Sequence, residues 1–464
     1  MKLKNAYLMF FYIIINVSLI LLCIFFIDKF NLITILSLLE IIMSIVIIFL
    51  YKKDLMLVGV IFLVLTYLFH FGQSLISTFS FNDKYAYKSV LSQVDKSIYI
   101  NAEIFAMLCI FAITIGYLFS NRNTNLENKK SILEYDLNEM TAIKNISIIV
   151  LIVSLIPMMY LDITKIITLS HGGYEMTYET YGTGFGKYMY LIGQFGRPAI
   201  TVLLFSLCNN KKLARKVFIY STLYYIIMML SGDRGTFMIY IISNVFVYFK
   251  FCKRLSVRTL LIFLILFYFL FGFISAISIF RYTDFSVESF VDAFIRRKDD
   301  GVLYSILREF GGTMLSLTHS LKYIPSYSDY NYGMTYLLGW LNVLPYLPEE
   351  IVELCNTSFT FVKAFPTSAA DFLSLGGSFL GELYFNFGWF GCLFSLIIGA
   401  FIGRLDICLN SVHNPRKIAF YIVLLPMLLL WVRDFFPSLL FKTFWLSILI
   451  FHYKKTGVRN KCEY

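Results

Sequence analysis

The chain has 464 residues, of which 58% are hydrophobic and 15% are charged, with a formal net charge of +11. No water-soluble domain of this size has that balance, because so much apolar surface could not be hidden from water. The composition excludes a soluble enzyme and indicates an all-α protein that crosses a membrane many times.

Twelve apolar stretches follow one another along the chain, most of them close to the roughly 20 residues that cross the hydrocarbon core. The first has no small-x-small cleavage site after it, so we interpret it as a retained helix and not as a signal peptide. We expect membrane spans at residues 7–27, 31–50, 55–79, 98–120, 145–167, 188–208, 217–231, 236–250, 259–280, 377–402, 418–432 and 436–452.

Lys and Arg gather on every second connection between these stretches. Basic residues concentrate in cytoplasmic loops, so the alternation predicts that both termini are cytoplasmic and that the remaining loops face outward. The positive net charge is then a topology signal and not a nucleic-acid footprint, and no nucleic-acid motif accompanies it. No cysteine spacing suggests a zinc site.

The expected spans divide the chain into three parts: nine spans within residues 1–280, an outward-facing segment 281–376, and three spans with a cytoplasmic tail in 377–464. Long segments of this kind are usually functional. This one alternates polar and apolar residues too finely to form a separate soluble domain. Within it we predict an amphipathic helix at 286–298, a second helix at 302–323 and a short interfacial or re-entrant helix at 336–343.

A charged turn interrupts an apolar run between the seventh and eighth expected spans, with the sequence Gly232-Asp233-Arg234-Gly235. Charged residues at membrane depth are costly and are candidates for function. The planar fork of Arg234 would grip a phosphate with two hydrogen bonds, with Asp233 beside it. The alternative is a plain hairpin turn that contains a local Asp–Arg pair.

Further arginines lie near the outer ends of three spans: Arg197 in the sixth, Arg281 with Tyr282 where the ninth ends, and Arg433 after the eleventh. An arginine inside the membrane needs an anionic partner, either from the protein or from a ligand. We expect these residues to bind substrate, with Arg433 facing the same cavity as Arg234. The alternatives are a snorkelling structural arginine at position 197 and an interfacial anchor at position 281.

The second predicted loop helix places Arg308, Gly312 and His319 close to one stripe, because eleven residues return a helix to within about 20°. Glu309 lies beside them. An arginine, a carboxylate and a histidine on one wall would bind sugar hydroxyls and take a proton from one of them. The alternative is a solvated helix face with a structural histidine.

Glu382 lies about one turn inside the tenth expected span, with Asn386 on the same face at position i+4. We expect Glu382 to act as the general base and His319 to orient the acceptor. A carboxylate inside an apolar helix is harder to explain structurally than a histidine on a solvated face. The alternative is a Glu382 that pairs with a neighbouring arginine and holds the bundle together.

Three motifs resemble those of bacterial oligosaccharide repeat-unit polymerases, the O-antigen polymerase group of the Wzy type. They are the Gly-Asp-Arg-Gly turn, Glu309-Phe310-Gly311-Gly312-Thr313, and the run Gly-Ser-Phe-Leu-Gly-Glu-Leu-Tyr-Phe-Asn-Phe-Gly-Trp-Phe-Gly from Gly377 to Gly391. The topology extends the resemblance over essentially the whole chain.

The resemblance implies an inverting, metal-independent enzyme of the bacterial cytoplasmic membrane that is similar to C-type glycosyltransferases and has no cofactor. Such an enzyme transfers a growing glycan from undecaprenyl diphosphate to the next lipid-linked repeat unit, for lipopolysaccharide, capsule or another polysaccharide. Both of its substrates, the donor and the acceptor, are lipid-linked. A protein that regulates chain length is a further partner that the resemblance leaves open.

The residues agree with this reading, because charge on the leaving diphosphate must be neutralised by Arg or Lys, or by a metal. The outward side offers several arginines and no Asp-x-Asp pair for a divalent cation. Two other enzyme or transport classes stay open: O-antigen ligases share the outer arginines and a loop histidine, and flippases also have many spans. A transporter should show symmetric halves, which the sequence lacks. A scaffolding protein would not explain the clustered charges.

Overall fold

The computed structural model describes residues 2–79, 94–120, 136–179, 184–231, 233–253, 302–341, 347–355, 376–411, 414–436 and 440–452, with the short pieces 255–256, 258–259, 261, 265, 295, 343–344, 361 and 364–365. Every regular element within these residues is a helix. Eight helices among them are long and apolar enough to cross a membrane. The chain is therefore an all-α polytopic membrane protein.

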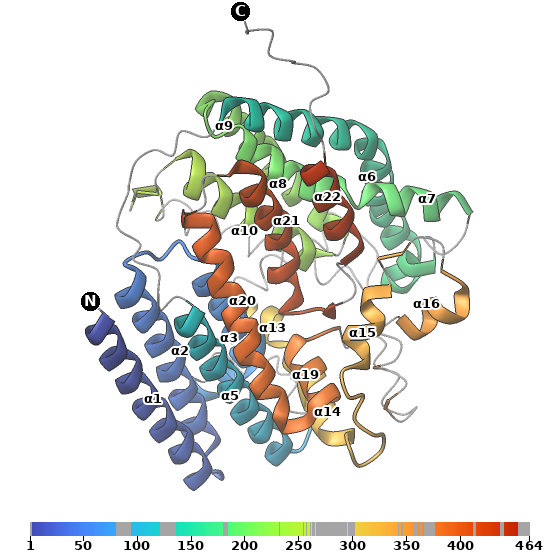
Figure 1. The fold of residues 1–464 in the computed structure, drawn as a ribbon. Helices are drawn as coiled ribbons and strands as arrows, with labels where there is room; N and C mark the ends of the chain where they lie inside the picture. Colours follow the sequence, from blue (N-terminus) through green and yellow to red (C-terminus); the bar gives the residue numbers. More distant parts are fainter. Residues whose placement is uncertain are drawn as a thin grey trace, which may run out of the picture.

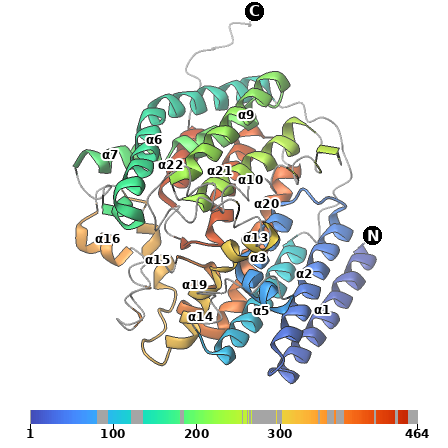
Figure 2. The same ribbon diagram turned by 180° about the vertical axis from the view of Figure 1, so that it is seen from behind.

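Four helices form an N-terminal bundle, drawn in blue to cyan in Figures 1 and 2: α1 (Lys2–Phe25), α2 (Phe30–Lys52), α3 (Val58–Thr78) and α5 (Lys96–Ser120). They lie close to the first four expected spans. Within an apolar 18-residue stretch of each helix, 83% of the residues are buried inside the protein in α3 but only 22% in α1. Hence α3 lies inside the molecule, and α1 presents most of its apolar surface to lipid.

The C-terminal part of the chain returns to this bundle through α20 (Gly391–Ser411), which runs along α5 in Figure 1. Two glycines bring the backbones together. A Cβ added to Gly116 would lie 2.0 Å from the Leu396 carbonyl oxygen, and one added to Gly399 would lie 2.0 Å from the Ile113 carbonyl oxygen. Small residues allow this close packing in a membrane, where dispersion contacts replace the hydrophobic effect.

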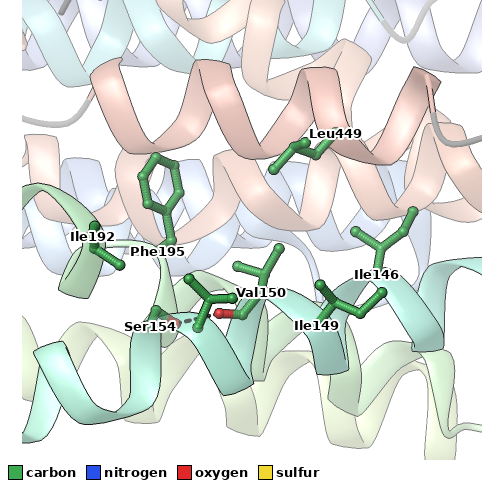
Figure 3. A pocket seen from close by; sticks show the side chains of 8 residues that line it. Ile146, Ile149, Val150, Ser154, Ile192, Phe195 and Leu449 are labelled. Atoms are coloured by element: carbon green, nitrogen blue, oxygen red, sulfur yellow. Dashed lines mark hydrogen bonds between the residues drawn. The ribbon is translucent and has the colours of Figure 1, made fainter.

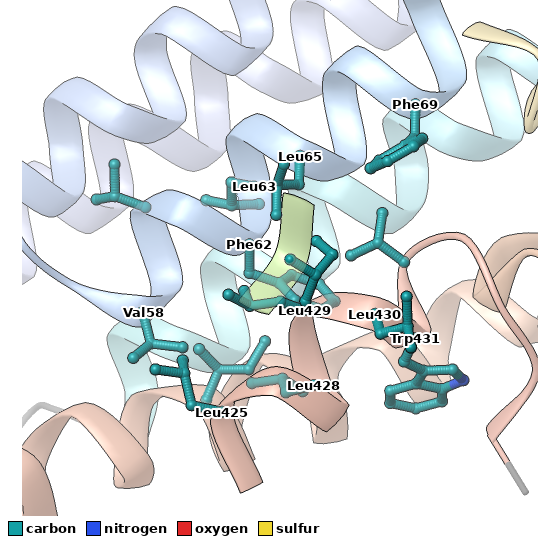
Figure 4. Packing of buried hydrophobic residues seen from close by; sticks show 14 of the residues in the cluster. Val58, Phe62, Leu63, Leu65, Phe69, Leu425, Leu428, Leu429, Leu430 and Trp431 are labelled. Atoms are coloured by element: carbon teal, nitrogen blue, oxygen red, sulfur yellow. The ribbon is translucent and has the colours of Figure 1, made fainter. Parts of the chain in front are cut away.

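A second helix group contains α6 (Leu137–Glu179), α8 (Gly196–Ser206), α9 (Lys211–Met228), α10 (Arg234–Val247) and α22 (Leu440–His452), as Figures 1 and 2 show. Between the two groups lies α21 (Pro415–Trp431). Figure 4 shows its buried leucines, among them Leu425 and Leu429, next to Val58 and Phe62 of α3. Interlocking apolar side chains thus join the two groups.

Two expected spans are broken helices and not continuous ones. The stretch 188–208 contains α7 (Gly184–Gly193), a turn and α8, and the stretch 377–402 contains α19 (Phe379–Phe387), a 3-10 turn (Gly388–Phe390) and α20. Gly388 has φ +55°, and a Cβ there would also lie 2.8 Å from the Tyr330 ring, so the break requires glycine. Irregular backbone at membrane depth is tolerated only where protein or a polar cavity surrounds it.

The expected loop helix at 302–323 is wrong as a single element, because it consists of α13 (Val302–Gly311) and α14 (Met314–Tyr323). A Cβ on Gly311 would lie 2.4 Å from the Gln73 backbone nitrogen, so α13 ends against α3. The common stripe of Arg308 and His319 is therefore lost.

Two short helices follow, α15 (Met334–Leu341) and α16 (Glu349–Cys355). The first overlaps the short helix expected at 336–343, whereas the second was not expected. Nearly all of the expected elements at 259–280 and 286–298 lies outside the described residues.

Candidate active site

The residues that follow α21 contact both α10 of the second helix group and α19. We call residues 433–436 the junction segment. A Cβ added to Gly235 of α10 would fall 1.7 Å from Arg433 Nη1, so this guanidinium lies directly against the glycine. At the other end of the segment, the Phe436 N–H donates to Glu382 Oε2 of α19 at 3.1 Å. A charged segment that meets a buried carboxylate is the first candidate for a functional site.

Arg197, in the first turn of α8, forms an ion pair with Asp162 of α6. The Asp162 carboxylate is fully buried and also accepts a hydrogen bond from the Tyr224 hydroxyl of α9 at 2.6 Å. The guanidinium carbon of Arg197 lies 4.8 Å from the centroid of the Phe237 ring, within cation–π distance. Its Nε is buried and has no hydrogen-bond partner among the described residues. Asp162 thus holds one end of the guanidinium, and Nε remains as a donor for an anion.

Lys165 and Asp233 form a second ion pair, with Nζ and Oδ2 3.6 Å apart. Asp233 also caps α10 by accepting a hydrogen bond from the Thr236 N–H at 3.4 Å. Burial by itself raises the pKa of Asp233. The charge of Lys165, the Thr236 hydrogen bond and the charges of Arg197 and Arg433 outweigh it and lower this pKa to about 2. Asp233 is therefore ionised at any physiological pH.

Lys442 of α22 lies close enough to Arg197, Asp434 and Asp233 for their charges to act on it. These side chains belong to one group, which we call the charged cluster: Asp162, Lys165, Arg197, Asp233, Arg433, Asp434 and Lys442. Four cations and three carboxylates leave an excess of positive charge. Such an excess, held by surrounding carboxylates, suits the binding of a phosphate.

Glu382 is fully buried. Its Oε1 accepts a hydrogen bond from the Thr335 hydroxyl of α15 at 2.9 Å. Its Oε2 accepts from the Trp431 indole N–H at 3.3 Å and from the Phe436 N–H. Asn386, one turn further along α19, donates to Thr335 Oγ1 at 2.8 Å. Glu382 therefore connects α15, the end of α21 and the junction segment.

His319 lies on α14 and is nearly enclosed. Its Nδ1 is 2.9 Å from the Leu315 carbonyl oxygen, so Nδ1 carries the proton in the neutral ring and Nε2 carries the lone pair. Burial lowers the pKa of His319; the Leu315 carbonyl opposes this effect, and the Lys322 charge adds to it. The imidazole is therefore neutral at physiological pH and can accept a proton through Nε2.

An aromatic cluster connects His319 to the junction segment. The His319 ring lies 6.0 Å from the Phe365 ring, and Phe361 contacts both Phe365 at 4.8 Å and Phe435 at 5.1 Å. All of these phenylalanines are buried. These ring contacts therefore connect the loop histidine to the junction segment, which also carries Arg433 and Asp434 of the charged cluster.

The structure brings together five of the residues that the sequence predicted: Arg197, Asp233, Glu382, Asn386 and Arg433. Arg234 is buried in the first turn of α10, next to Asp233. Arg308 lies on α13, where its carbonyl oxygen accepts a hydrogen bond from Gln73 Nε2 at 3.1 Å. Arg281, Tyr282 and the side chain of Glu309 lie outside the described residues.

Sequence reasoning missed Asp162, Lys165 and Lys442. Each is a charged residue inside or at the edge of an apolar stretch, which is a usable signal by itself. No local spacing links them to Arg197, and Asp162 is 35 residues away from it in the chain. In the described part of the chain, no three His, Cys, Asp or Glu side chains gather as metal ligands would.

A buried histidine of the N-terminal bundle was also missed. His70 Nε2 lies 2.8 Å from Ser378 Oγ, and His70 Nδ1 lies 2.8 Å from the Thr66 carbonyl oxygen. Ser378 in turn accepts a hydrogen bond from the Gly381 N–H and so caps α19. His70 therefore fixes the start of the helix that carries Glu382.

The family model of O-antigen polysaccharide polymerase Wzy matches residues 7–454, a range that includes nearly all of both helix groups, the loop helices and the whole charged cluster. The chain matches no curated protein and no solved structure.

Proposed function

The chain belongs to the O-antigen polysaccharide polymerase Wzy family, and on this premise we propose that it extends a glycan at the outer face of the bacterial cytoplasmic membrane. Membership makes it a multi-pass membrane glycosyltransferase that polymerises repeat units. In the proposed reaction, the growing glycan leaves undecaprenyl diphosphate and joins a hydroxyl group of the next lipid-linked repeat unit. The diphosphate already activates the sugar, so the reaction uses no nucleotide and no cofactor.

The charged cluster is the observation that supports this proposal. Negative charge grows on the diphosphate as its bond to the sugar breaks, and cations held in place beforehand stabilise that charge without reorganisation. Arg197 Nε, Lys165, Arg433 and Lys442 supply the positive charge in our proposal, in place of a metal ion. Asp162 and Asp233 keep these side chains in position.

We propose that the transfer inverts the anomeric carbon. The acceptor oxygen forms a bond to this carbon while the bond to the diphosphate oxygen breaks, and the electron pair of that bond leaves with the diphosphate. The hydroxyl proton passes to His319 Nε2. A weak base is sufficient because the transition state resembles an oxocarbenium ion and positioning contributes much of the rate.

In this proposal Glu382 is a positioning residue. The sequence alone favoured the opposite assignment, with Glu382 as the base and His319 as the residue that orients the acceptor. Three protein donors, Thr335, Trp431 and Phe436, engage both of its carboxylate oxygens, which supports a role in holding the junction segment. Asn386 shares this role through its bond to Thr335.

The other expected residues keep the roles that the sequence predicted for them. Arg234 would assist the phosphate site, and Arg281, Tyr282, Arg308 and Glu309 would bind the sugars. Cytoplasmic termini and a likeness to C-type glycosyltransferases also belong to the proposal.

The experiment uses the purified protein and lipid-linked repeat units extracted from a strain that lacks it, with glycan ladders as the readout. Arg197→Lys keeps the charge and loses the fork, so it should lower turnover about 30- to 1000-fold, as expected for ~2–4 kcal/mol of transition-state stabilisation. Arg416→Lys is the matched control. Arg416 pairs with Glu139 at the other end of α21, so the same substitution there should leave turnover unchanged.

Wild-type ladders from a protein that carries both Arg197→Lys and Lys442→Gln would contradict the phosphate site. A product transferred only to an acceptor other than a lipid-linked repeat unit would favour the ligase reaction instead.

A further inference from the structure

A groove of about 320 Å³ lies between α6, the α7–α8 turn and α22, as Figure 3 shows. Its lining includes Ile149, Val153, Ser154, Ile192, Phe195 and Leu449. The Ser154 hydroxyl donates to the Val150 carbonyl oxygen at 2.7 Å, so its hydrogen is not directed at a ligand. The groove is therefore suited to a hydrocarbon and not to a sugar.

The groove opens onto the lipid-facing surface of the protein. Val153 is 60% exposed, and Ile149 and Leu449 are about half exposed, although all three are apolar. Ile149 and Val153 lie on α6, which is long and apolar enough to cross the membrane, so the space outside them is filled by lipid chains. A hydrocarbon chain can thus enter the groove sideways from the bilayer.

The charged cluster begins a short distance along the chain from one end of the groove. Phe195 lines the groove, and Arg197 follows two residues later. On α6, Ser154 lines the groove and Asp162 lies eight residues further on, which is ~12 Å along a helix. The end of the α7–α8 turn contacts α6 between these two positions, because a Cβ on Gly196 would lie 2.7 Å from Met158 Sδ.

We infer that this groove holds the isoprenoid tail of the donor lipid whose diphosphate the charged cluster binds. The inference rests on the proposed function. A lipid with an anionic head and a long hydrocarbon tail needs cations and an apolar surface side by side, and the fold places them about two helical turns apart. The excess positive charge and the buried Arg197 Nε favour an anionic diphosphate over a zwitterionic lipid head.

The first test narrows the groove. Val153→Trp should raise the KM of the undecaprenyl-linked substrate roughly tenfold, the change expected when about two methylene groups lose their burial, and should leave kcat unchanged. A substrate linked to a carrier of about two isoprene units should show no such change. Ile156→Trp is the matched control, because Ile156 is exposed on the same helix but does not line the groove.

The second test measures binding without activity. The photoreactive residue p-benzoylphenylalanine replaces Val153 or Ile156 in the full-length protein, held in phosphatidylglycerol nanodiscs with added undecaprenyl diphosphate. Mass spectrometry should find an undecaprenyl diphosphate adduct at position 153 and not at position 156. An adduct of phosphatidylglycerol alone at position 153, or equal adducts at both positions, would overturn the inference.

The two proposals can fail separately. A wild-type protein that makes no glycan ladder but gives the specific adduct at position 153 would remove the proposed function and keep the groove as a lipid site. A normal ladder together with an unchanged KM in Val153→Trp and no adduct would remove the groove and keep the polymerase.

Discussion

Arg197 and Asp162 illustrate how a charge is kept inside this membrane protein. Asp162 has two partners, Arg197 and the Tyr224 hydroxyl, so its carboxylate is fixed from two helices. Removing one member of such a buried pair leaves the other uncompensated, which costs more than the pair contributes. The arrangement therefore holds Arg197 in place before any ligand arrives, as an electrostatic site requires.

The lowered pKa of His319 predicts the pH dependence of the reaction. In the proposed reaction the neutral ring is the base, so kcat/KM should fall only as the pH drops through a value below the pKa of an ordinary histidine. Lys322→Gln removes a cation that lowers this pKa, and should move the acid limb to higher pH. A pH–rate profile in which Lys322→Gln leaves the limb in place, or in which His319→Gln retains it, would contradict the role of His319 as the base.

Replacing two buried carboxylates with apolar side chains should have different effects on the stability of the protein. Glu40 is 1% exposed, and neither oxygen has a hydrogen-bond partner among the described residues, so Glu40→Met should change stability by less than ~1 kcal/mol or increase it. Asp406 accepts from the Val58 N–H, the Gly59 N–H and the Tyr117 hydroxyl.

Asp406→Leu would leave these three buried donors without an acceptor and should lower the free energy of unfolding by on the order of 3 kcal/mol. Thermal unfolding in detergent compares the two variants with the wild type. Equal losses in both would mean that Glu40 has a partner that the described residues do not contain.

At the scale of elements, the two broken helices give the candidate site its shape. The break between α7 and α8 places Arg197 at a helix start, and the break after α19 places Glu382 and Asn386 on a short helix capped by Ser378. A continuous helix would carry all of its side chains along one straight axis. Breaks near the membrane interior are common where polar groups are gathered.

Two glycine substitutions should separate packing from function. Gly399→Ala places a methyl group 2.0 Å from the backbone oxygen of Ile113, which cannot move alone, so we expect a loss of ~1–3 kcal/mol in stability. In Gly235→Ala the added methyl group contacts the end of the flexible Arg433 side chain, which can move away. The free energy of unfolding should therefore stay unchanged, whereas the displaced guanidinium should shorten the glycan. Thermal unfolding and ladder length, measured together, test both. Full ladders from Gly235→Ala would remove Arg433 from the site.

At the scale of the whole molecule, the alternating basic loops predict which side of the membrane carries the site. Ser328 lies between α14 and α15, in the segment expected outside. Ser328→Cys, in a background without other cysteines, should react with an impermeant maleimide in intact cells, or in spheroplasts if an outer membrane intervenes. Lys212→Cys, in a loop expected inside, should react only after lysis. The reverse pattern would invert the whole topology and place the charged cluster in the cytoplasm.

The sequence alone determined the class of the protein. The transfer of each apolar stretch into lipid depends almost wholly on its own residues, so composition was sufficient to predict a polytopic membrane protein and the approximate place of most helices. The motifs around Arg234, Glu309 and Glu382 were also local, and the resemblance that they carry is confirmed by the family match.

Tertiary structure decided which charges share a site. Asp162 pairs with Arg197 across 35 residues, Phe436 donates to Glu382 across 54, and His70 meets Ser378 across 308. It also split the expected 302–323 helix, because Gly311 lies against α3. Periodicity within one stretch cannot specify the partner of a side chain in another. That choice depends on how the helices pack, and in lipid the packing follows from small residues and buried polar contacts and not from hydropathy.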